Sequence, residues 1–153
     1  MPEPATLVII RRVLLAILLI GMAGTTVELI LLKHDEEATQ LIPLVLLGLA
    51  FLAIAWHAAR PSVASVLTMQ VMMVLFVAAG LIGTFLHYQA SVEFQQEMDK
   101  SLAGMPLFWK AVAAKAPPAL APGSMSQLGL IGLAYSYRYP IVAGGPGRSA
   151  LRT

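Results

Sequence analysis

Two short motifs place an ionisable side chain inside a long apolar segment of the 153-residue sequence. Each motif has two glycines and a threonine at helical spacing, followed three residues later by an ionisable residue. The motifs are Gly21, Gly24, Thr25, Glu28 and Gly80, Gly83, Thr84, His87. On a helix, such small residues form one stripe that lets a second helix approach closely. We predict that the two stripes pack together and bring the Glu28 carboxylate to the His87 imidazole.

Glu28 and His87 are also the centre of a larger set of metal-binding side chains. This set has two imidazoles and three carboxylates at one predicted membrane level: Glu28, His34, Asp35, His87 and Glu93. The donors suit a transition metal such as zinc, iron, manganese or copper(II). A haem held by His34 and His87 is an alternative. A Glu28–His87 hydrogen bond that only fixes helix register is the plainer interpretation.

The composition is that of an integral membrane protein. Hydrophobic residues make up 58% of the chain, charged residues 12%, and the mean hydropathy is +0.79, whereas soluble domains have about 25% charged residues. The net charge is only +2, and no basic run alternates with aromatic residues, which argues against a nucleic-acid partner. The chain lacks cysteine, which excludes disulfides and thiolate chemistry. No complete Ser/His/Asp set or nucleotide-binding glycine motif is present, so an enzyme is not favoured.

The apolar segments predict an all-α fold in which residues 1–153 form one membrane domain. We expect four transmembrane helices at about 8–33, 41–59, 63–87 and 125–140. The connection 88–124 is too long for a simple loop, and we expect it to hold short helices. One of these, at about 105–115, mixes aromatic and lysine residues and suits the lipid headgroup layer. Residues 144–153 are predicted to be a flexible tail.

The arginines predict the orientation of the spans. They all fall at the N-terminus, between the second and third spans, or at the C-terminus: Arg11, Arg12, Arg60, Arg138, Arg148 and Arg152. The positive-inside rule therefore predicts a multi-pass protein of the inner (plasma) membrane with both termini in the cytoplasm. The metal-binding set and the long connection then lie on the extracytoplasmic side.

Three further groups of residues have structural interpretations. His57, beside Trp56, is expected to be an interfacial anchor, and a group of tyrosines with Arg138 is expected to form an aromatic belt at the same face. The tyrosines are Tyr135, Tyr137 and Tyr139. Methionines at 69, 72 and 73 are expected to fill the core rather than bind copper(I).

The recurrence of the glycine–threonine motif raises the alternative of a duplicated helical hairpin. The two copies are offset by 59 residues, from Gly21 to Gly80, and duplication would make Glu28 correspond to His87. Chance matches are the plainer explanation of the recurrence, because glycine and threonine are common where membrane helices touch.

Two classes of function fit these features. The first is a small non-catalytic membrane subunit that docks on a larger membrane complex or on other copies of itself, because the chain is small and its glycine-rich last span is short. The alternative is a metal-, haem- or quinol-handling membrane protein that uses the carboxylate–imidazole set. A transporter or channel is disfavoured, because one buried acid offers little of a pathway through four spans.

Overall fold

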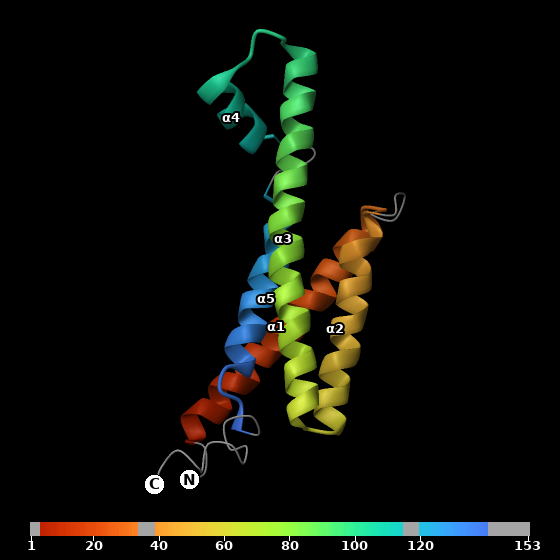
Figure 1. The fold of residues 1–153 in the computed structure, drawn as a ribbon, viewed down its shortest axis with the longest axis vertical. Helices are drawn as coiled ribbons and strands as arrows, with labels where there is room; N and C mark the ends of the chain where they lie inside the picture. The colour runs from red at the N-terminus through yellow and green to blue at the C-terminus, as the bar shows by residue number, and fades with distance from the viewer. Residues whose placement is uncertain (1–3, 34–38, 115–119, 141–153) are drawn as a thin grey trace. The chain divides into compact units, whose positions relative to one another are not determined.

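The computed structural model describes residues 4–33, 39–114 and 120–140, and the regular structure in these ranges is entirely helical. The helices are α1 (Ala5–Leu31), α2 (Leu41–Ala59), α3 (Val63–Met98), α4 (Gly104–Val112) and α5 (Gly123–Ser136) (Figure 1). The prediction of an all-α fold is therefore confirmed for the described residues. Helices α1, α2 and α3 are long and apolar enough to cross a membrane.

The chain divides into two compact units. Unit 1 is Met1–Phe76 together with Leu128–Thr153, and unit 2 is Val77–Gln127. Helices α3 and α5 contribute residues to both units, because the unit boundaries fall within them. The predicted tail at 144–153 lies outside the described residues.

The helix bounds differ from the predicted spans at two places. Helix α3 has 36 residues and continues to Met98, beyond the expected end of the membrane span at 87, because the glutamines and glutamates after the apolar run are good helix formers. Helix α5 has only 14 residues, or about 21 Å, against a hydrocarbon core of about 30 Å. It is followed by Arg138 in the left-handed backbone region, with φ of 46°, and then by Pro140. Both features favour a helix end.

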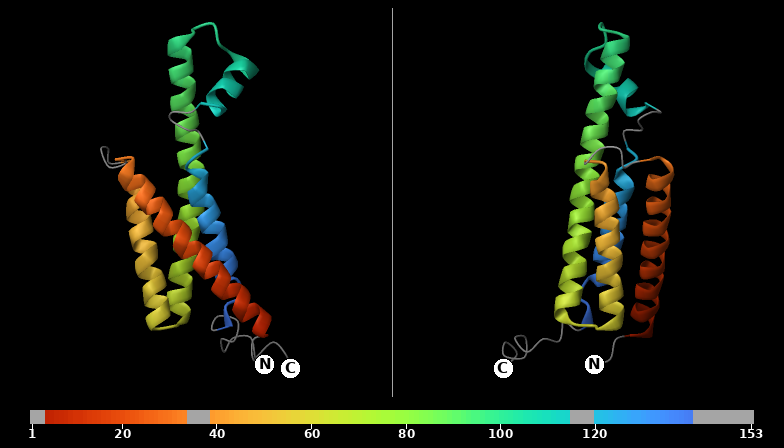
Figure 2. Two further views of the ribbon diagram at one scale, coloured as in Figure 1. Left: turned by 180° about the vertical axis from the view of Figure 1, so that it is seen from behind. Right: turned by 90° about the vertical axis from the view of Figure 1, so that its right-hand side faces the viewer.

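Unit 1 has an aliphatic and methionine core. In Figure 2, α2 runs beside the first part of α3, and α1 lies obliquely against the part of α5 that belongs to unit 1. The fully buried apolar side chains of unit 1 include Leu18, Met22, Leu47, Val66, Met69, Met73 and Phe76. A Cβ on Gly132 of α5 would collide with the Met73 side chain and lie 3.4 Å from Leu18 Cδ2. Met73 therefore packs at the close approach of α5, and Met69, Met72 and Met73 are all buried, as expected for core residues.

Unit 2 contains the second part of α3, the first residues of α5, and α4, which folds back beside α3 (Figure 1). Leu107 and Ala111 of α4 are buried. The turn after α3 is closed by Asp99, whose carboxylate accepts hydrogen bonds from the hydroxyl and the backbone N–H of Ser101 at 2.6 and 3.0 Å. These two bonds lower the pKa of Asp99. Gly104 then begins α4 at a φ of +61°, which glycine adopts without strain.

Three hydroxyl groups in the helices donate to the backbone of their own helix. Thr26, Thr84 and Ser136 each donate to the carbonyl oxygen four residues earlier, at 2.8, 2.8 and 3.0 Å. Among the described residues, every buried side-chain nitrogen or oxygen has a hydrogen-bond partner. This is the pattern that a low-dielectric environment requires.

Candidate functional site

The residues of the predicted metal set are distributed over both units. Glu28 is exposed in the last turn of α1, while His87 is half-buried and Glu93 is exposed on α3. His34 and Asp35 lie outside the described residues. In the continuous helix α3, Glu93 is six positions after His87, so the two lie about 9 Å apart along the axis and about 120° apart around it. They do not share a helix face.

Within the described ranges, which omit 34–38, no three His, Asp or Glu side chains gather as metal ligands. Glu28 belongs to unit 1 and His87 to unit 2, so their predicted pairing stays a prediction. The five-residue metal set also stays a prediction, because His34 and Asp35 are not among the described residues.

Each glycine stripe has a close neighbour near α5. In unit 1, a Cβ on Gly21 would collide with Leu128. In unit 2, a Cβ on Gly80 would lie 2.5 Å from the backbone nitrogen of Ser126, and one on Gly83 would lie 2.8 Å from Pro122 Cβ. Gly21, Gly80 and Gly83 thus serve close helix packing, and their neighbours belong to α5 or the residue before it. The packing of one stripe against the other stays a prediction.

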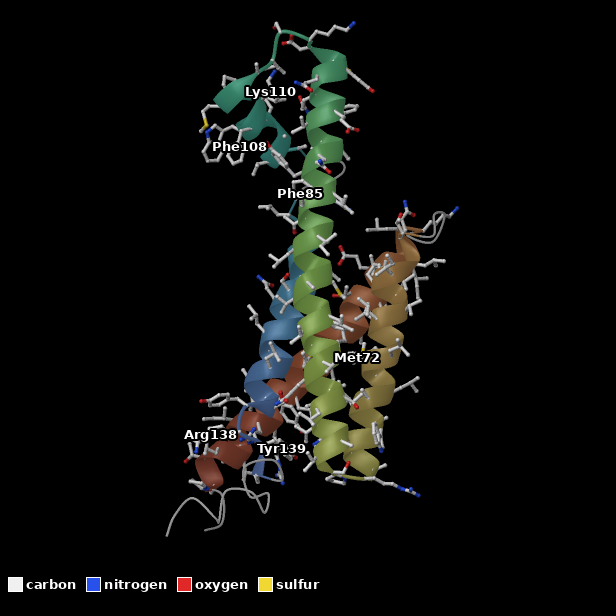
Figure 3. All side chains as sticks on the ribbon, viewed as in Figure 1. Met72, Phe85, Phe108, Lys110, Arg138 and Tyr139 are labelled. Atoms are coloured by element: carbon white, nitrogen blue, oxygen red, sulfur yellow. The ribbon has the colours of Figure 1, made fainter. Side chains whose placement is uncertain are left out.

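The most densely connected polar side chains of unit 1 form a different cluster. We call it the arginine–tyrosine cluster, and it consists of Arg11, His57, Ser65, Tyr135 and Tyr139. Figure 3 shows Tyr139 after α5, at the end of unit 1 where α2 turns into α3. The cluster joins the beginning of α1, the end of α2, the beginning of α3 and the end of α5. The start of α1, the α2–α3 turn and the end of α5 have the arginines that predicted one membrane face, and these three segments therefore meet within unit 1.

Arg11 closes the C-terminal end of α5. Its guanidinium donates to the carbonyl oxygens of Tyr135, of Tyr137 at 3.0 Å, and of Arg138 at 3.4 Å. The last carbonyls of a helix have no intrahelical donor and carry partial negative charge, so a cation there is doubly favourable. The same guanidinium lies over the Tyr139 ring, 5.2 Å from its centroid, which adds a cation–π contact.

His57 is held by the capping residues of α3. Its Nδ1 lies 2.9 Å from Ser65 Oγ, and Ser62 and Ser65 exchange backbone-to-side-chain hydrogen bonds at 3.0 and 3.1 Å. The Ser65 hydroxyl donates to the Ser62 carbonyl, so its single proton is committed and the His57 Nδ1–H donates to it. The His57 ring also packs edge-on against Tyr139 at 4.9 Å.

These contacts correct the expectation for His57. The side chain is 4% exposed, so it is a buried hydrogen-bonding residue rather than an interfacial anchor. The cluster holds four helix ends together.

The helical spacing of Arg11 relative to apolar residues indicates that it faces the rest of unit 1, which the count of positive charges does not show. Arg11, Leu18 and Met22 are seven and four residues apart and therefore lie on one face of α1. Leu18 and Met22 are the buried residues of that helix. Arg11 therefore points toward the rest of unit 1, whereas its neighbour Arg12 is exposed.

Ser65→Ala should destabilise unit 1 by about 2 kcal/mol, because the buried Nδ1–H of His57 and the N–H of Ser62 lose their acceptor. The measurement is the SDS concentration at the midpoint of unfolding in mixed micelles, followed by circular dichroism. Ser124→Ala is the matched control, since its exposed hydroxyl bonds only to the Ala121 carbonyl, and it should shift the midpoint little. Equal shifts for the two variants would contradict the assigned role of Ser65.

In the part of the chain that the structure describes, the fold is all-helical, and three of the helices are long and apolar enough to span a membrane and are joined at one end of unit 1 by polar contacts. No protein-family model matches the chain, and no curated protein or solved structure matches it.

Proposed function

We propose that this chain is a small non-catalytic integral membrane subunit that docks on a larger membrane complex through α1. In this proposal α1, α2, α3 and the short α5 cross the inner (plasma) membrane with both termini in the cytoplasm. The arginine–tyrosine cluster supports that orientation, because it gathers the arginine-bearing ends of α1 and α5 with the α2–α3 turn.

The observation that carries the docking proposal is the sparse packing of α1. All 27 of its residues are described, and only Leu18 and Met22 are buried. Helix α2 is shorter, with 19 residues, yet five of them are buried. A helix of α1's length that gives so few side chains to its own protein has most of its surface left for lipid or for another chain.

One face of α1 has the residues of a helix–helix contact. Gly24 and Glu28, one turn apart, are both exposed, and no described atom lies within 4 Å of the position of a Cβ on Gly24. Glycine in a membrane helix permits close approach of a neighbour, and a carboxylate in an apolar helix requires a hydrogen-bond or charge partner. A partner helix that covers Gly24 and offers a donor to Glu28 satisfies both requirements.

Gly24→Leu should abolish co-purification of the partner in mild detergent while leaving the chain folded, since the added side chain enters open space. Gly48→Leu is the matched control, because Gly48 is an equally open glycine on α2. We expect the complex to lose at least about tenfold in affinity with the first variant, or about 1.4 kcal/mol. The measurement is the mass and composition of the native complex extracted from the membrane.

Two results would sink this proposal. One is a wild-type chain that leaves its native membrane as a lone monomer. The other is equal loss of the partner with Gly24→Leu and Gly48→Leu. Recovery of a complex that contains only further copies of this chain would identify the partner as a second copy.

A further inference from the structure

Helix α4 has two apolar faces, of which one is covered by unit 2. Leu107 and Ala111, one turn apart, form the buried face. Met105, Phe108 and Trp109 form what we call the exposed arc, and they are 62%, 39% and 61% exposed. At about 100° per residue these three side chains fall within roughly 100° of the helix circumference. Lys110 projects from the other side of the helix.

A ring contact with α3 fixes the position of α4 along the axis of α3. The Tyr88 and Phe108 rings lie 5.9 Å apart. Tyr88 comes two positions after the exposed apolar part of α3, which includes Leu81, Ile82, Phe85 and Leu86. A tyrosine at the end of such a run lies at the headgroup level when the helix crosses a bilayer. Phe108 is therefore at that level too.

The side of α4 that faces the apolar part of α3 has an aromatic residue, whereas the side that faces the end of α3 has a lysine. Figure 3 shows Phe108 on the side of α4 nearer Phe85 and Lys110 on the side nearer the end of α3. The Lys110 charge acts on the Asp99 carboxylate in the turn after α3 and contributes to its lowered pKa. The polar side of α4 is thus directed away from the apolar part of α3.

We propose that α4 is an interfacial helix whose exposed arc inserts into the lipid headgroup layer where α3 leaves the membrane. The proposal rests on the membrane insertion of α3 that is part of the proposed function. The lipid surface is the occupant that the geometry favours, because the arc continues the lipid-facing surface of α3 at the level of Tyr88. Tryptophan and phenylalanine with a lysine opposite are typical of helices that lie in this layer.

Trp109 can report on this position directly. The chain has two tryptophans, so Trp56→Phe leaves Trp109 alone in the full-length protein. After reconstitution into phosphatidylcholine vesicles, we expect its emission to be blue-shifted relative to free N-acetyltryptophanamide. Iodide quenching should fall at least about threefold, and a nitroxide near the headgroup should quench it more than one near the chain end.

The reciprocal variant Trp109→Phe leaves only Trp56 and provides the reference for a tryptophan in a predicted membrane span. Flotation of the vesicles after an alkaline wash tests insertion separately, and a protein that does not float contradicts the proposed membrane location. If the protein floats, full iodide quenching of Trp109 would place the arc in water and overturn the interfacial helix. Shielding from both iodide and the nitroxides would also overturn it and would indicate a protein contact.

Discussion

Gly80→Val should detach the start of α5 from α3 and destabilise unit 2 by about 3 kcal/mol. A Cβ at position 80 would lie 2.5 Å from the Ser126 backbone nitrogen and 2.9 Å from the Pro122 carbonyl oxygen. These are backbone atoms of the segment that begins α5, so no rotamer change relieves the collision. The whole segment must move away from α3.

The same movement would break a hydrogen bond between the helices. Ser126 Oγ donates to the Val77 carbonyl at 3.0 Å, on the turn of α3 before Gly80. In an apolar environment the lost bond is not replaced by water, so the steric and hydrogen-bonding costs add. This coupling is the reason that we expect Gly80→Val to have one of the two largest effects.

Engineered cysteines can measure the detachment, because the chain has no native cysteine. A Cβ on Gly123 would lie 3.9 Å from Thr84 Oγ1, so the Thr84→Cys, Gly123→Cys pair is within reach of a disulfide. We expect rapid oxidation in the otherwise native chain and at least about tenfold slower oxidation with Gly80→Val. Gly48→Val is the control, since that glycine has open space around it. Equal oxidation rates in both variants would show that α5 does not approach α3 at Gly80.

The sequence was sufficient to predict the helical fold and much of its extent, because apolar runs have a length and a period that backbone hydrogen bonding fixes. Helix α2 has the expected bounds of Leu41 and Ala59. The membrane span expected at 63–87 is shorter than α3, because hydropathy measures where a helix leaves lipid, whereas Met98 is where the helix itself stops.

The partners of individual side chains were harder to predict. The spacing of Gly80 and Gly83 shows that they share a helix face, but the same face is compatible with any neighbour, and the structure puts Pro122 and Ser126 there. Arginine was counted only as a positive charge at one membrane face. That count treats Arg11 and Arg12 as equivalent, although only the first lies on the face of α1 that packs.

Arg11→Ala should destabilise unit 1 by about 3 kcal/mol, while Arg12→Ala should change its stability by less than about 0.5 kcal/mol. Loss of Arg11 leaves the carbonyls of Tyr135 and Tyr137 without their charged donor at the end of α5. It also removes the cation from the Tyr139 ring. The measurement is the SDS unfolding midpoint of the reconstituted chain, with Trp56 fluorescence in a Trp109→Phe background as a second probe.

The two neighbouring arginines make a matched pair. Each variant removes one positive charge from the same end of α1, so any effect of charge on membrane orientation is the same for both. The difference between the variants therefore isolates the hydrogen bonds that Arg11 makes to α5. Equal destabilisation by both would mean that Arg11 acts only as a topology-determining charge.

Arg11→Lys separates the charge from the shape of the guanidinium. An ammonium keeps the favourable interaction with the helix C-terminus, but it lacks the planar fork that reaches several carbonyls at once. We expect Arg11→Lys to recover about half of the stability lost in Arg11→Ala. Full recovery would assign the effect to charge at the end of α5, and no recovery would assign it to the forked hydrogen bonds with Tyr135, Tyr137 and Arg138.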